Sequence, residues 1–159
     1  MRQIRQIVLE SMYEAENSTH AATAVLDRRL NEDAEDDHDL DRKDARRAAS
    51  EMLSGAMEVM PASDDLISRA AARYPLENMA VIDRNILRLA IWELLTDESA
   101  PVAAVINEAV ELAHRYGGES SPAFVNGVLR TVSQEISSRG GALAQPPVSP
   151  DPIDIDQEN

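Results

Sequence analysis

The segment 79–96 constrains the fold of this 159-residue chain more than any other part of it. Its apolar residues would cover most of the circumference of a helix, and they are Met79, Ile82, Ile86, Leu87, Leu89, Ala90, Ile91, Trp92, Leu94 and Leu95. A helix that is apolar nearly all round is stable only when other elements surround it. We therefore expect this segment to be the central helix of the core.

Helical periodicity also marks the flanking segments. Apolar residues recur every three or four positions in 2–16, in 42–60, in 101–116 and in 121–139, and Ser18 or Thr19 can cap a further helix that runs to about Leu30. Aromatic residues make up only 3% of the chain, so small aliphatic side chains must form the core. That composition favours close-packed helices over strands, and it predicts an all-α fold.

Two signals divide the middle of the chain. The helix over 42–60 should stop before Pro61, and Ser63 followed by Asp64 and Asp65 is a strong signal for the start of a new helix. That helix must end by Tyr74, because the residue before a proline disfavours helical geometry.

The formal net charge of -14 argues against a broadly basic nucleic-acid surface. The acidic residues are concentrated, however, in the stretch 31–44 and in the C-terminal segment 141–159. We predict a helical domain over 1–140, interrupted by an acidic loop over 31–41 and followed by a disordered, acidic, proline-rich tail over 141–159. The remainder of the chain has room for a local phosphate-binding patch.

Several classes of site lack their signatures in this sequence. There is no cysteine, which excludes disulfides, thiolate metal sites and a cysteine nucleophile. The histidines share no metal-ligand spacing, and neither a phosphate-binding glycine loop nor a nucleophile elbow is present. No apolar stretch is long enough to span a bilayer or to form a signal peptide. We expect a cytoplasmic protein that is not an enzyme and that has no metal or cofactor.

Polar residues inside the most apolar segments need partners. Arg84 and Arg88 lie four residues apart on the predicted central helix, where like charges repel. Glu93, Asn107 and Glu108 interrupt the two most hydrophobic helices and could supply the partners. We interpret Arg88, Asn107 and Glu108 as members of a hydrogen-bond network between helices.

Two residues of the last predicted helix allow more than one interpretation. Gly127 costs about 1 kcal/mol relative to alanine inside a helix, so we expect it to permit a close approach between helices. Phe124 is the only phenylalanine and follows Ser120, Ser121 and Pro122 at the start of the helix. It either belongs to the core or forms a stacking platform beside phosphate-binding backbone amides.

Three stretches, taken together, resemble the NusB family of transcription antitermination factors. They are Ile82–Leu94 (IDRNILRLAIWEL), Val105–Ala113 (VINEAVELA) and Phe124–Leu129 (FVNGVL). Their order and spacing match the family, and Arg2-x-x-Arg5 with Met12-Tyr13 is similar to its arginine-rich first helix. The resemblance covers residues 2–138.

The resemblance implies an all-helical fold of about seven helices in two small packed bundles, without enzymatic activity. Members pair with the ribosomal protein NusE and bind the boxA element of nascent ribosomal RNA leaders, and they support rRNA transcription and maturation in an antitermination complex with RNA polymerase. It also implies that RNA contacts Arg2, Arg5, Ser120 and Phe124. The residues implied for NusE binding are Tyr13 and Asp83.

Alternatives to these roles remain open from the residues alone. Asp83 could merely favour the start of its helix, and Tyr13 could fill the core. Only two arginines stand at this N-terminus, where family members often carry three or more, so RNA binding should be weak without NusE. The alternative function is a homodimeric protein–protein interaction module with little RNA binding of its own.

Overall fold

The computed structural model describes residues 1–32 and 40–140. Over these ranges the chain forms seven α-helices, one short 3-10 helix and no strand, which confirms the all-α prediction. The elements are α1 (Arg2–Glu16), α2 (Ala22–Glu32), α3 (Leu40–Glu58), α4 (Met60–Ala70), the 3-10 helix η1 (Leu76–Asn78), α5 (Val81–Thr96), α6 (Val102–Tyr116) and α7 (Ser121–Ser138).

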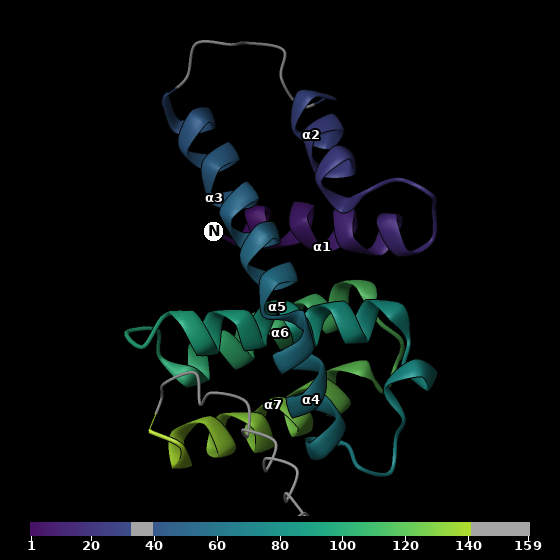
Figure 1. The fold of residues 1–159 in the computed structure, drawn as a ribbon, viewed down its shortest axis with the longest axis vertical. Coiled ribbons are helices and arrows are strands. Elements are labelled where there is room, and N and C mark those ends of the chain that lie inside the picture. The colour runs from purple at the N-terminus through teal and green to yellow at the C-terminus, as the bar shows by residue number, and fades with distance from the viewer. Residues whose placement is uncertain (33–39, 141–159) are drawn as a thin grey trace, which may run out of the picture.

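The helices form two bundles (Figure 1). Helices α1, α2 and α3 pack on one another in the first bundle, and α4, α5, α6 and α7 pack together in the second. The bundles are joined where α1 and α3 contact α5 and where α3 leads directly into α4. The two-bundle arrangement implied by the resemblance is therefore confirmed.

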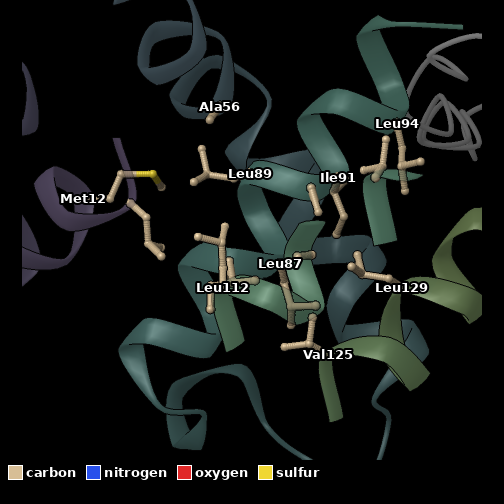
Figure 2. Close-up of a cluster of buried hydrophobic side chains, with 14 of the residues drawn as sticks. Met12, Ala56, Leu87, Leu89, Ile91, Leu94, Leu112, Val125 and Leu129 are labelled. Atoms are coloured by element: carbon tan, nitrogen blue, oxygen red, sulfur yellow. The ribbon is translucent and has the colours of Figure 1, made fainter. Parts of the chain in front are cut away.

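Helix α5 is the central helix, as its all-round apolar character predicts. It contacts α1, α3, α4, α6 and α7. Figure 2 shows Leu87, Leu89 and Ile91 of α5 among apolar side chains from several of these helices, and labelled neighbours are Met12, Leu112, Val125 and Leu129. Burial of each such aliphatic side chain contributes about 1.5–3 kcal/mol, so α5 organises most of the core.

The start of α2 differs from the prediction. The Ser18 hydroxyl accepts a hydrogen bond from the backbone N–H of His20 at 3.2 Å, which stabilises a loop rather than a first helical turn. Helix α2 therefore begins at Ala22. Hydroxyl side chains stabilise such local turns as readily as helix starts, so Ser18 alone could not fix the boundary.

The predicted start of α4 at Ser63 is also wrong. The helix begins at Met60, with Pro61 in its first turn, where the missing proline N–H is not needed and its fixed φ suits the helix. Ser63 is buried inside α4 rather than at its cap. The proline signal marked a helix start and was interpreted as a stop.

The predicted acidic loop over 31–41 is shortened by helix at both ends, because α2 extends to Glu32 and α3 begins at Leu40. Its centre and the predicted tail over 141–159 lie outside the described residues, so both remain predictions. No helix within the described ranges is long and apolar enough to cross a membrane. Those ranges also contain no group of three or more histidine, aspartate or glutamate side chains suited to a metal.

Candidate functional site

Arg2, at the start of α1, binds the carboxylate of Glu108 on α6. Its Nη2 donates to Oε1 at 2.8 Å and its Nε donates to Oε2 at 3.2 Å. The Arg2 side chain is 64% exposed, so water and salt screen this pair. Hydrogen bonding to Arg2 nevertheless lowers the pKa of Glu108 below its ordinary value. The Nε–Nη2 edge of the exposed arginine that we predicted to bind RNA is therefore used by a carboxylate of the same chain.

Arg5, one turn further along α1, binds Glu93 on α5 in the same two-fold manner. Its Nε and Nη2 lie 2.5 and 2.8 Å from the two carboxylate oxygens. This pair is much more enclosed, since only 16% of the Arg5 side chain is exposed. The hydrogen bond to Glu93 raises the pKa of Arg5, although burial opposes the shift. The pair fixes α1 against the central helix.

The arginines of α5 form a network with partners that we did not predict. Arg88 binds both oxygens of Asp64 on α4, at 2.7 and 2.9 Å, and donates to Glu16 at the end of α1 at 2.9 Å. Arg84 donates to the other oxygen of Glu16 at 2.6 Å. The network therefore connects α1, α4 and α5, and the interpretation of Arg88 as a packing residue agrees with its position.

The polar residues predicted as partners of Arg84 and Arg88 lie elsewhere. Glu93 and Glu108 bind the N-terminal arginines instead, and Asn107 is exposed on α6. Helical spacing identified these polar residues as unusual, but it could not show which helix would face them.

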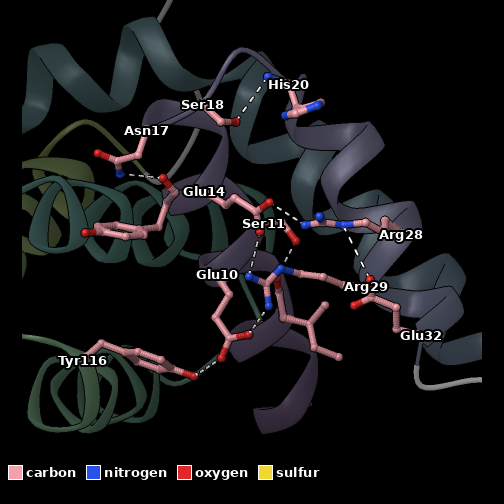
Figure 3. Close-up of polar contacts among 12 residues, drawn as sticks. Glu10, Ser11, Glu14, Asn17, Ser18, His20, Arg28, Arg29, Glu32 and Tyr116 are labelled. Atoms are coloured by element: carbon pink, nitrogen blue, oxygen red, sulfur yellow. Dashed lines mark hydrogen bonds and ion pairs between the residues drawn. The ribbon is translucent and has the colours of Figure 1, made fainter.

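Tyr13 lies on the surface at the C-terminal half of α1 and is 44% exposed, so it does not fill the core. It lines a hollow, which we call the Tyr13 hollow, together with Glu10, Arg29, Ile82 and Tyr116. Polar contacts hold the walls (Figure 3). The Tyr116 hydroxyl donates to Glu10 at 2.5 Å, and Arg29 donates to the other Glu10 oxygen at 2.8 Å.

Asp83 follows Ile82 in the first turn of α5 and is only 9% exposed. Its Oδ1 has no hydrogen-bond partner within the described residues. A buried carboxylate oxygen without a donor is costly, so the fold leaves an acceptor unsatisfied in the first turn of α5, one residue after Ile82 of the Tyr13 hollow.

Phe124 and Ser120 lie together at the start of α7. The Phe124 ring is half-buried against the core and also meets the ring of Tyr74, with centroids 5.5 Å apart and planes tilted by 53°. Ser120 is exposed. The turn before it is tight, because a Cβ on Gly117 would lie 2.5 Å from the Ser121 side chain. Only a glycine fits there, which explains the end of α6.

Gly127 does not serve the role predicted for it. A Cβ built on this residue would meet no atom within 4 Å, so no neighbouring helix approaches it closely. It is exposed in the middle of α7.

Comparison with known proteins identifies the family. The family model described as NusB matches residues 2–134, nearly the whole of the described structure. The chain belongs to the NusB family. Its members are non-enzymatic, RNA-binding transcription antitermination factors.

Relatives of known name cover most of the chain. The transcription antitermination protein NusB of Dehalococcoides mccartyi strain CBDB1 is 37% identical over 86% of this chain and 91% of its own length. The solved structure of T. maritima NusB has 35% identity and a TM-score of 0.74, and it covers 84% of this chain and 90% of that one. A structure titled as antitermination factors NusB and NusE in complex with dsRNA has the same fold, with 21% identity, a TM-score of 0.71 and coverage of 84% and 96%.

The residues implied by the NusB resemblance occupy separate places in the structure. Arg2 and Arg5 lie on the first half of α1, whereas Ser120 and Phe124 lie at the start of α7. Tyr13 lies near the end of α1, and α1 contacts α5, whose first turn carries Asp83.

Sequence reasoning missed Tyr74 as a neighbour of Phe124. It interpreted Tyr74 only as the end of a helix, because the linker between α4 and α5 has no periodicity. The one available signal was a large aromatic residue at an exposed turn in a chain with few aromatics.

Proposed function

We propose that this NusB-family protein binds the boxA element of ribosomal RNA leaders together with NusE, and that it supports rRNA transcription and maturation. In this proposal it works in the cytoplasm, within an antitermination complex with RNA polymerase. Membership of the family supports the proposal, as does the solved relative that carries NusE and dsRNA.

The observation that carries the proposal is the exposed ring of Tyr13, in a hollow whose wall includes Ile82, the residue before the largely buried Asp83. A basic partner that places an arginine or lysine beside the 9% of Asp83 that is exposed would stabilise its carboxylate charge. The tyrosine ring supplies an amphipathic contact of the kind enriched at binding hot spots. We propose these two residues as the centre of the NusE surface.

The proposed RNA surface consists of Arg2, Arg5, Ser120 and Phe124. A phosphate at Arg2 would replace Glu108, and exposure of that pair makes the exchange easier than at the enclosed Arg5–Glu93 pair. The net charge of -14 opposes RNA elsewhere on the surface and attracts a basic protein. RNA binding should therefore be weak for the chain alone and strong for its complex with NusE.

The test of the partner surface uses calorimetric titration of NusE into three variants. We expect Tyr13→Ala to weaken binding by about tenfold, as hot-spot tyrosines do, and Asp83→Asn to weaken it comparably while the circular dichroism spectrum stays native. Met57→Ala is the matched control, because Met57 is also 44% exposed but lies on α3. NusE affinity that is equal in all three variants would contradict the proposal.

A gel-shift with boxA RNA, with and without NusE, tests the RNA half of the proposal. We expect a clear shift only when NusE is present. A protein that is dimeric by sedimentation, and that binds neither NusE nor RNA, would instead support the homodimeric interaction module.

A further inference from the structure

A groove runs between the end of α4, with the residues that follow it, and the first turns of α7. Small side chains such as Ala123 form part of its walls, and Tyr74 and Phe124 are its aromatic members. Tyr74 is 50% exposed. Gly127 also lines the groove, and a Cβ built on it would meet no atom within 4 Å. The α4–α7 groove therefore presents an aromatic face and a bare stretch of helix backbone to solvent.

The charges at this groove are positive. Arg73 is the one charged residue among those that line it. Arg130 is exposed on α7 three residues after Gly127, a spacing that makes the two neighbours on the helix surface. The single acidic residue of α7, Glu135, is already bound by two arginines. An acidic ligand that lies along this wall of α7 is therefore attracted rather than repelled.

The sequence that follows α7 contains a segment of matching chemistry. Residues 146–154 read PPVSPDPID, and the stretch 141–159 has four acidic residues and no basic one. Such a composition cannot form a core of its own, but its prolines favour the polyproline II helix. Aromatic-lined grooves bind polyproline II segments at a low entropic cost, because the ligand is already ordered. The segment therefore suits both the rings and the arginines of the groove.

The segment also lies at a distance from which it can reach the groove of its own chain. Gly140 follows α7 with a φ of 81°, the left-handed geometry that lets the backbone reverse direction after a helix. At 1.5 Å per residue, Gly127 lies about 20 Å back along α7 from that point. Six residues of polyproline II cover about 19 Å, which brings Pro146 level with Gly127. The residues after Pro146 can then meet the rings.

We propose that the proline-rich segment 146–154 binds in the α4–α7 groove of its own chain. Its prolines pack on the rings of Tyr74 and Phe124. Its carboxylates pair with Arg73 and Arg130. Little intrinsic affinity is needed, because a short linker holds the segment near the groove at an effective concentration in the mM range.

This docking limits access to Phe124, a residue of the proposed RNA surface. A segment that occupies the groove for about two thirds of the time lowers the apparent affinity of a competing ligand about threefold. The full-chain variant Pro147→Gly/Pro150→Gly keeps the charge of the segment but removes its polyproline II preference. Its affinity for boxA RNA in the presence of NusE should therefore rise about threefold. This consequence rests on the proposed function, whereas the docking itself does not.

Paramagnetic relaxation in the full chain tests the docking without RNA. The chain has no cysteine, so Ser149→Cys provides a single thiol for a nitroxide label in the middle of the segment. The amide signals of Ala123 and Gly127 should lose most of their intensity. The signal of Val25 on α2, in the other bundle, should not change.

A groove variant distinguishes docking from mere tethering, because a segment that only diffuses near α7 affects both proteins alike. In the labelled chain that also carries Arg73→Gln/Arg130→Gln, the signals at the groove should recover most of their intensity. The control is Arg42→Gln/Lys43→Gln, which removes the same charge from exposed positions on α3. It should leave the signals as weak as in the labelled wild type.

The outcomes separate the docking from the proposed function. Full signals at the groove, or equal recovery in the groove variant and its control, would overturn the docking. Signal loss in an unlabelled chain mixed with the labelled one would place the segment of a second copy in the groove, and it would overturn the intramolecular proposal. If the docking is observed but the complex with NusE does not bind boxA RNA, the docking stands and the proposed function is wrong.

Discussion

Two pairs of arginines in this protein differ in their surroundings more than in their own chemistry. Each of the two arginines at the start of α1 donates two hydrogen bonds to one carboxylate. Arg2 binds a carboxylate of α6, and Arg5 binds one of α5. Arg73, between α4 and η1, and Arg130, exposed on α7, have no carboxylate partner within the described residues. The comparison shows that an arginine motif indicates phosphate affinity only when the carboxylates that face the arginines are known.

The difference has a thermodynamic consequence for RNA binding. An unpaired arginine that binds a phosphate releases the counterions of that phosphate, which makes binding salt-dependent. When Arg2 binds a phosphate, its pair with Glu108 must open first. Arg2 therefore adds less affinity than an unpaired arginine would, although its phosphate releases the same counterions.

The largest effect expected from this comparison is on stability. Glu93→Gln removes the charge that compensates the enclosed Arg5, and breaking such a pair should lower the free energy of unfolding by about 2–4 kcal/mol. Urea denaturation followed by circular dichroism measures it. The control is Glu111→Gln at an exposed position on α6, which should change stability little. Equal stabilities for the two variants would show that the Arg5–Glu93 pair does not hold α1.

A smaller effect, a gain in RNA affinity rather than a loss of stability, is expected at the exposed Arg2–Glu108 pair. Glu108→Gln releases Arg2 from its carboxylate, so affinity for boxA RNA should rise by about fivefold near 0.1 M salt, the gain from one added phosphate contact. The melting temperature should change little, because solvent screens the pair. Fluorescence anisotropy with labelled RNA checks the affinity. A loss of affinity in this variant would mean that Glu108 positions Arg2 for RNA rather than competing with it.

The central helix and the stripes of the other helices could be predicted because burial follows directly from apolar periodicity. The end of α6 could also be predicted, because Gly117 and Gly118 follow Tyr116. Helix boundaries near Ser18 and Pro61 were not, because serine stabilises loops and helix starts alike and proline suits a first turn as well as a stop.

The candidate site was less accessible to sequence reasoning. The partners of Arg88 and Arg5 depend on how helices distant in sequence cross, and spacing within one helix carries no such information. The role of Gly127 could not be judged either, because the empty space beside it appears only once its neighbours are placed.

The central claim is that Glu108 competes with RNA for Arg2. Its most direct test is the affinity for boxA RNA, measured with NusE present near 0.1 M salt for the wild type, Glu108→Gln and the double variant Arg2→Gln/Glu108→Gln. Affinity should rise about fivefold in Glu108→Gln and should lose that gain in the double variant, because the added phosphate contact belongs to Arg2. A gain that persists in the double variant would contradict the account.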